Sequence, residues 1–186
     1  MRRLLLLRHA KTERAEPSER DRDRKLTTRG RADAIVIGSY IARLGLVPDL
    51  VLVSPATRAE ETWALVAPAF APAPRVVKDE RIYTGRKSLI SIIRETHDAH
   101  ALLIVGHNPD LHDIAVRLIN SGNVEARERV NEKLPTSGLV VIDFPFDDWS
   151  RLNTKAGRLE RFVSPRLIAA ATDLIARKSR KGEIAI

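Results

Sequence analysis

Four consecutive leucines at residues 4–7 are followed at once by the polar pair Arg8-His9. An unbroken apolar run of this length fits a strand buried on both faces, as in a parallel sheet between helices. In open α/β sheets, ligands bind at the carboxyl ends of the strands, and His9 lies where this strand would end. On these residues alone, an ordinary strand end with a solvated arginine and histidine fits equally well. The residues that follow the other strands decide between the two interpretations.

Further short apolar runs alternate along the chain with segments of helical spacing. We expect strands at 50–53, 76–77, 101–105, 139–142 and 159–163, the last of them as an alternating edge strand. We expect helices over 26–44, 54–68, 88–96, 111–119, 124–131 and 168–175. Because strands alternate with helices, the sequence predicts an α/β fold. It is a single three-layer domain over residues 1–186, with a mostly parallel open sheet and helices on both faces.

Local signals place several helix ends. Thr27 or Thr28 is the expected N-cap of the first helix, and Gly45 is its expected stop. Ser54 is the expected N-cap of the second helix, with Pro55 at its first helical position. The segment 79–85, between a strand and a helix, is expected to be a loop.

Composition narrows the class of partner. The chain carries a net charge of +8, which suits a phosphorylated substrate, but only four Phe, two Tyr and two Trp are available to stack on bases. We therefore expect no nucleic-acid partner. The charged segment 13–25 is predicted to be a mobile surface loop, and 176–186 a frayed basic tail. No apolar segment is long enough to span a membrane, and no signal peptide is evident, so the cytoplasm is the default location.

Three polar residues occupy equivalent places in this pattern. His9 follows the first strand, Arg58 lies in the first turn after the second strand, and His107 follows the strand that ends at Val105. Parallel neighbouring strands would bring all three to one sheet edge. Each residue alone also has an ordinary structural explanation: Arg58 could be an exposed helix residue and His107 a turn residue. Their joint placement favours a site.

Two histidines and two arginines without a metal suit phosphoryl transfer through a phosphohistidine. A neutral imidazole is a competent nucleophile toward phosphorus. Arg8 and Arg58 are permanent cations whose planar forks match phosphate oxygens. They would neutralise the charge on those oxygens, as Mg²⁺ does in kinases. His107 could donate to a phosphate oxygen when protonated. The chain has no cysteine, and His97 and His100 lack further ligands at metal spacing, so we expect neither metal nor cofactor.

Several motifs occur in an order that resembles the histidine phosphatase superfamily, and most closely its short, SixA-like phosphohistidine phosphatases. They are Arg8-His9-Ala10, Leu26-Thr27-x-x-Gly30, Ser54-x-x-x-Arg58-x-x-x-Thr62, Glu80-Arg81-x-Tyr83 and Gly106-His107-Asn108. The resemblance spans residues 4 to about 144 and implies a phosphoglycerate mutase-like fold. It also implies His9 as the phosphorylated nucleophile and Arg8, Arg58 and His107 as the phosphate pocket. Ala10 replaces the more common Gly of the Arg-His-Gly motif, as it does in many short members.

The function predicted on this basis is metal-independent dephosphorylation of phosphohistidine on proteins. One alternative is a phosphatase or mutase for small phosphate esters, although a mutase should have more chain between Arg58 and His107 to enclose its substrate. An alternative of another class is a non-catalytic module that binds phosphorylated or nucleic-acid ligands, although binding alone would not need both histidines. The sequence does not indicate an oligomeric state.

Proton donation to an alkoxide leaving group usually needs a positioned carboxylic acid. Glu80 is the best candidate because it follows the strand at 76–77 and so could reach the same sheet edge. Asp79 is an alternative, and a solvated loop carboxylate without a catalytic role is another. The long charged loop 13–25 is expected to shape access to the pocket.

Overall fold

The leucine run forms the central strand of the sheet, β1 (Arg2–Arg8). The computed structural model describes residues 1–15, 17 and 20–180. On one side β1 pairs in parallel with β4 (Ala101–Gly106), and on the other it pairs antiparallel with β6 (Leu139–Phe144). Residue for residue, Arg8 faces Gly106 across the β1–β4 ladder, so both strands end at the same level.

The full sheet has the strand order β3-β2-β4-β1-β6-β7-β5. The remaining strands are β2 (Leu50–Val53), β3 (Arg75–Lys78), β5 (Ile119–Gly122) and β7 (Gly157–Val163). Within this sheet β6 alone runs against the others, which confirms the mostly parallel sheet.

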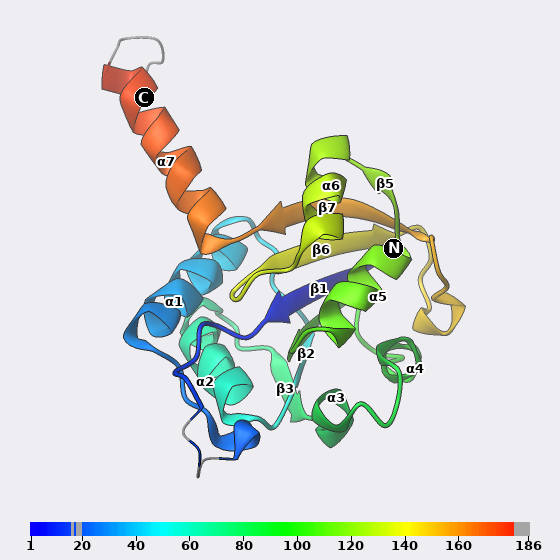
Figure 1. The fold of residues 1–186 in the computed structure, drawn as a ribbon. Coiled ribbons are helices and arrows are strands. Elements are labelled where there is room, and N and C mark those ends of the chain that lie inside the picture. Colours follow the sequence, from blue (N-terminus) through cyan, green and yellow to red (C-terminus); the bar gives the residue numbers. More distant parts are fainter. Residues whose placement is uncertain (16, 18–19, 181–186) are drawn as a thin grey trace.

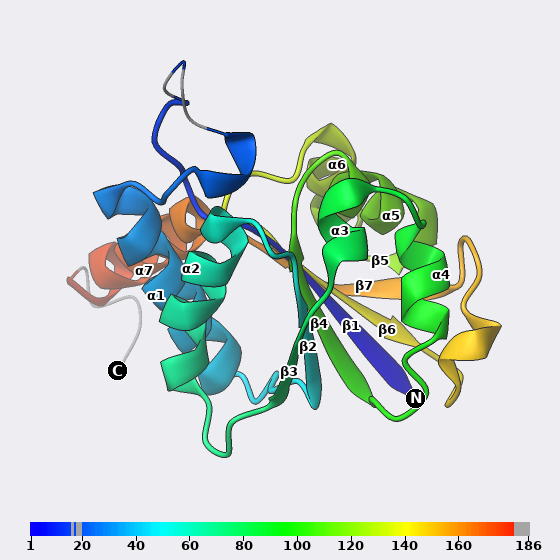
Figure 2. The same cartoon turned by 90° about the horizontal axis from the view of Figure 1, so that it is seen from below.

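Helices cover both faces of the sheet (Figure 1 and Figure 2). On one face lie α1 (Thr28–Arg43) and α2 (Thr57–Val66). The other face carries α3 (Glu80–Thr84), α4 (Leu89–Arg94), α5 (Asp110–Leu118) and α6 (Val124–Glu132). The C-terminal helix α7 (Pro165–Arg180) starts beside α1 and projects away from the domain in Figure 1. Short 3₁₀ turns occur at Asp21–Asp23, Ala67–Ala69 and Trp149–Arg151.

Alternate leucines of β1 pack into opposite halves of the hydrophobic core. Leu4 and Leu6 join the cluster under α4 and α5, and Leu5 and Leu7 join the cluster under α1 and α2; all four are fully buried. Burying a leucine contributes about 1.5–3 kcal/mol. The run is therefore apolar at every position because each face of the strand has a helix layer to pack against.

Two strand expectations were wrong. The strand at 159–163 was predicted at an edge, but β7 lies between β6 and β5. The edge strand on that side is β5, which the sequence did not reveal because only its first residue, Ile119, is apolar. That residue also continues the helical pattern of α5, so the apolar period gave no sign of a strand.

Local corrections concern two segments and the tail. Ser54 is not an N-cap: α2 begins at Thr57, three residues later. The expected loop 79–85 contains α3, capped by the Asp79 side chain, which accepts from the Arg81 N–H, and closed by Gly85 at φ +63°. Residues 176–180, predicted to be frayed, continue α7, and 181–186 lie outside the described residues.

No helix within the described ranges is both long and apolar enough to cross a lipid bilayer.

Candidate active site

The carboxyl ends of β1, β2 and β4 bring His9, Arg58 and His107 together. His9 follows β1 and its N–H donates to the Gly106 carbonyl at 3.0 Å, immediately before His107. The two imidazole rings lie 5.2 Å apart between centroids. Arg58 reaches them from the first turn of α2, which follows β2. Three segments far apart in the sequence thus meet at one edge, as the strand pattern predicts.

The tautomer of His9 follows from a single contact. Its Nδ1 lies 2.8 Å from the Ala10 carbonyl oxygen. A carbonyl oxygen can only accept, so Nδ1 carries the proton and donates it. The lone pair of a neutral His9 is therefore on Nε2. The Ala10 N–H in turn donates to Thr62 Oγ1 at 2.9 Å, which ties the residue after His9 to α2.

A chain of hydrogen bonds fixes His107. Arg58 Nε donates to His107 Nδ1 at 3.2 Å, and His107 Nε2 lies 2.7 Å from Ser54 Oγ. Because Nδ1 accepts, the proton of neutral His107 is on Nε2, which donates to the serine. Ser54, predicted as a helix cap, instead positions this imidazole.

Both imidazoles are neutral at physiological pH in this arrangement. Burial, together with the charges of Arg58 and Arg8 and against the opposing bond to Ala10, lowers the pKa of His9 to about 4. Burial and then Arg58 lower the pKa of His107 to about 3. Neutral His9 suits a nucleophile. The sequence suggests His107 as a donor when protonated, and in this arrangement the neutral ring already donates through Nε2–H.

Arg8 faces the segment that precedes β6. Its Nη1 donates to the Leu134 carbonyl at 2.9 Å, and Asn108 Nδ2 donates to the same oxygen at 3.0 Å. The Ser137 N–H donates to the His9 carbonyl at 3.1 Å. Arg8 Nε, Ser137 Oγ and Asn108 Oδ1 are buried and have no hydrogen-bond partner within the described ranges. Two of the three, Arg8 Nε–H and Ser137 Oγ–H, can act as donors.

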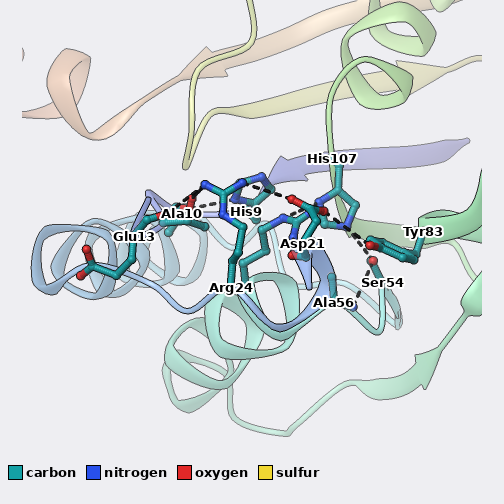
Figure 3. Close-up of polar contacts among 11 residues, drawn as sticks. His9, Ala10, Glu13, Asp21, Arg24, Ser54, Ala56, Tyr83 and His107 are labelled. Atoms are coloured by element: carbon teal, nitrogen blue, oxygen red, sulfur yellow. Dashed lines mark hydrogen bonds and ion pairs between the residues drawn. The ribbon is translucent and has the colours of Figure 1, made fainter. Parts of the chain in front are cut away.

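Asp21, from the charged loop, reaches the site beside His107 (Figure 3) and contacts the other arginine, Arg58. Arg58 Nη2 donates to Asp21 Oδ2 at 2.9 Å, and Arg58 Nη1 donates to the Asp21 carbonyl at 2.6 Å. Partial burial raises the pKa of Asp21, but Arg24 and Arg58 outweigh it and hold this pKa below its usual value. The outer edge of Arg58, where a phosphate oxygen would bind, therefore holds an ionised carboxylate.

Described residues of the loop that carries Asp21 make contacts with two other parts of the chain. Its base closes where Thr12 bridges to Leu26, and Arg24 Nη2 donates to Thr12 Oγ1 at 2.8 Å. In the 3₁₀ turn Asp21–Asp23, the Arg22 guanidinium lies 5.6 Å from the centre of the Tyr83 ring. Tyr83 belongs to α3, so this turn contacts both α2, through Arg58, and α3.

Glu80, the predicted acid, lies at the rim. Its carboxylate accepts from Arg22 Nη2 at 2.6 Å, and its side chain is 59% exposed. Tyr83, one turn along α3, separates it from the histidines: the Tyr83 and His107 rings lie 5.9 Å apart. Asp79, the alternative, caps α3 and is bound by Arg81, so it is committed to structure.

Comparison with known proteins agrees with this geometry. A model of the histidine phosphatase superfamily (branch 1) matches residues 4–83. An uncharacterised protein of Mycobacterium leprae is 33% identical over 168 residues, 86% of this chain and all of its own length. The crystal structure assigned to the phosphohistidine phosphatase SixA of Agrobacterium tumefaciens is 32% identical, with a TM-score of 0.75 over 88% of this chain and 98% of that one. The chain belongs to the histidine phosphatase superfamily.

A second SixA structure, from Nakamurella multipartitia, superposes on this histidine phosphatase with a TM-score of 0.74 over 88% of this chain and 96% of that one. Its identity of 24% supports the fold alone. Together these similarities confirm the SixA-like resemblance and the phosphoglycerate mutase-like fold.

The histidine phosphatase site also contains residues that sequence reasoning missed. Asp21 was overlooked because a charged loop has no period from which to place it. The role of Ser54 was hidden by a cap-like Ser-Pro pair, and the segment 134–137 carries no motif. In the described part of the chain, no group of three or more His, Cys, Asp and Glu could hold a metal ion.

Proposed function

We propose that this chain is a phosphatase that works through a phosphohistidine intermediate on His9 and removes phosphoryl groups from histidines of other proteins. Membership of the family supports phosphatase activity. The observation that carries the finer proposal is the state of His9: a neutral imidazole whose Nδ1 proton is bound by a backbone carbonyl, leaving the Nε2 lone pair next to two arginines and a second neutral histidine.

The reaction follows in two displacements. In the first, His9 Nε2 attacks phosphorus, its N–P bond forms, and the bond from phosphorus to the substrate nitrogen or oxygen breaks. In the second, water attacks the same phosphorus, the N–P bond to His9 breaks, and inorganic phosphate leaves with the water oxygen. Arg8 and Arg58 would stabilise the charge on the equatorial oxygens in both steps. Once the hydrogen bond from His107 Nε2–H to Ser54 is broken, the neutral His107 ring would donate to a phosphate oxygen instead.

The architecture supports a protein substrate over a small ester. Residues 59–106, which lie between Arg58 and His107, contain the remainder of α2, then β3, α3, α4 and β4. No additional subdomain is present in this described segment, so it does not supply the enclosing cap that a mutase needs. An imidazole also leaves more readily than an alkoxide, so a phosphohistidine substrate makes a weaker demand on the general acid.

We retain Glu80 as the candidate acid, and we do not assign that role to Asp21, which contacts Arg58 and is held ionised by two arginines. In its ion pair with Arg22, Glu80 is one helix turn from the residue that contacts His107. The cytoplasmic location and the absence of a metal requirement also remain predictions. Activity that survives EDTA would support the second, and a complete loss restored by Mg²⁺ would contradict it.

The test is direct trapping of the intermediate. Rapid acid-free quench after mixing with a ³²P-labelled phosphoramidate should give a phosphoenzyme that survives base and is lost in acid. His9→Ala should abolish the label, and His100→Ala, which removes an exposed histidine elsewhere, should leave it unchanged. Label that persists in His9→Ala would exclude the assignment. Binding of phosphate without any turnover of aryl phosphate or phosphoramidate would favour the non-catalytic alternative.

A further inference from the structure

A second concavity opens at the same edge of the sheet as His9. It has a volume of about 530 Å³ and is bordered by the residues after His9, the start of α1, the end of α6, the end of β7 and the start of α7. This volume lies within the range of about 300–1,000 Å³ typical of ligand sites. We call it the basic groove, because its lining includes the cations Lys11, Arg29, Arg129, Lys133 and Arg166.

The positive charge of the basic groove is poorly compensated. Its lining holds five cations and two carboxylates, Asp33 and Glu132, a formal charge of +3. The ion pairs of these carboxylates, with Arg29 and Lys133, are long, at 3.8 and 3.7 Å, and such exposed pairs are weak. Arg129 is paired at 2.6 Å with Glu125, which lies outside the lining. Lys11 and Arg166 form no ion pair with any residue that the structure describes.

The lining of the basic groove also contains apolar residues. They are Pro135, Phe162, Pro165 and Leu167, and each is half-buried. The cations of the lining come from several separate elements and are accompanied by these apolar residues, which does not match a compact site for a single phosphate. This arrangement suits an extended segment with acidic and apolar side chains in turn.

The segment 134–137 borders both the basic groove and the candidate active site. Pro135 and Thr136 line the groove, and their neighbours Leu134 and Ser137 bind Arg8 and the His9 backbone from the other side. Lys11, also in the lining, is two residues beyond His9. A chain that crosses this segment could present a phosphohistidine to His9 and its flanking residues to the groove.

We propose that the basic groove binds an acidic segment that flanks the phosphohistidine of a protein substrate. The proposal rests on the proposed function, which it deepens by naming the chemistry of the substrate around the phosphorylated residue. The groove would add affinity without touching the reacting atoms, so it should affect protein and peptide substrates and leave a small aryl phosphate unaffected.

The test uses two phosphohistidine peptides that differ only in their flanks, one rich in Glu with a central Leu and one with Gln at each Glu position. The wild-type chain should prefer the acidic peptide, and 0.5 M NaCl should reduce that preference. The double variant Lys133→Glu/Arg166→Glu should lower kcat/KM for the acidic peptide about tenfold. It should change turnover of the Gln peptide and of p-nitrophenyl phosphate less than about twofold.

Arg151→Glu is the matched control, because it reverses an exposed charge in the 3₁₀ turn between β6 and β7 and not in the groove lining. Lys133→Gln is a milder variant if the double reversal unfolds the chain. An equal loss on both peptides, or no preference in the wild type, would overturn the proposal.

A binding measurement separates this proposal from the proposed function. The labelled acidic peptide with an unphosphorylated histidine should bind the wild-type chain in fluorescence anisotropy and bind the double variant more weakly. Such binding without turnover of any phosphorylated substrate would support the groove and contradict the phosphatase assignment. Turnover with equal binding of both peptides, or displacement by tripolyphosphate with no dependence on the peptide flanks, would contradict the groove alone.

Discussion

At the residue scale, the ion pair between Asp21 and Arg58 bears directly on the phosphate-binding role proposed for Arg58. Asp21 occupies the outer edge of Arg58, with Tyr83 OH 3.4 Å from the same carboxylate oxygen. A phosphate that binds Arg58 there must displace it. Since Asp21 is more than half exposed, this competition is modest and the pair is easily exchanged.

We therefore expect Asp21→Asn to tighten product binding. Removing the negative charge frees Arg58, and an exposed ion pair worth about 0.5–1 kcal/mol corresponds to about two- to fivefold. The inhibition constant of inorganic phosphate or tungstate should fall by this factor. Asp23→Asn, on the same 3₁₀ turn but paired with Arg20, is the control and should leave it unchanged. Weaker inhibition of Asp21→Asn would mean that Asp21 assists binding.

Glu80 makes a prediction that depends on the leaving group. Glu80→Gln removes a proton donor and should slow hydrolysis of alkyl phosphates by about 100-fold, but that of phosphoramidate by less than about threefold. Steady-state rates on both substrates give the ratio. Arg22→Gln breaks the same ion pair and keeps the carboxyl group, and Glu95→Gln changes an exposed carboxylate just after the end of α4. Equal slowing of both substrates would refute the leaving-group argument, and no slowing of either would remove Glu80 from the mechanism.

At the scale of elements, the junction of α1 with the loop after β1 depends on one glycine. A Cβ on Gly30 would lie 2.1 Å from the Lys11 carbonyl oxygen, which accepts from the Thr27 N–H at 2.9 Å. The helix start and the residues after His9 can approach this closely only without a side chain at position 30. This explains in physical terms why Leu26-Thr27-x-x-Gly30 belongs with the site motifs.

Gly30→Ala should therefore destabilise the fold and the site together. Backbone shifts of this kind cost about 1–3 kcal/mol, because a fixed carbonyl cannot move aside as a flexible side chain can. Urea unfolding should show this loss, and kcat/KM should fall with it as Lys11 and Ala10 move. Ser39→Ala, an exposed change in the same helix, should change neither. A stable Gly30→Ala variant with full activity would contradict the role given to this contact.

The strands also show how much of the fold and of the site could be predicted from the sequence. The strands at 4–7 and 101–105 were readable because both faces are buried, so every residue is apolar; polar residues at their ends then indicated His9 and His107. The position of β7 and the existence of β5 depend on pairing between strands, and the apolar pattern of a single strand does not predict its partners. The position of Asp21 depends on its contact with Arg58, which comes from another segment, and no local sequence signal predicts that contact.

At the scale of the whole molecule, burying two neutral histidines makes folding stability depend on pH. In the folded chain the pKa values of His9 and His107 lie at about 4 and about 3, whereas an unfolded histidine titrates near 6.5. Between these values the unfolded chain binds more protons than the folded chain. The free energy of unfolding must therefore fall as pH decreases below about 6.5, and the loss continues to about pH 4 for His9 and about pH 3 for His107.

We expect this loss to reach, at most, about 1.4 kcal/mol per pH unit for each histidine. Urea unfolding between pH 7 and pH 5, above the range in which most carboxylates titrate, should show the slope. His9→Gln and His107→Gln should each remove about half of it, because glutamine does not titrate. His100→Gln, at an exposed position, should keep it. An unchanged slope in both variants would contradict this prediction. It would mean that the folded chain accommodates protonated imidazoles between Arg8 and Arg58.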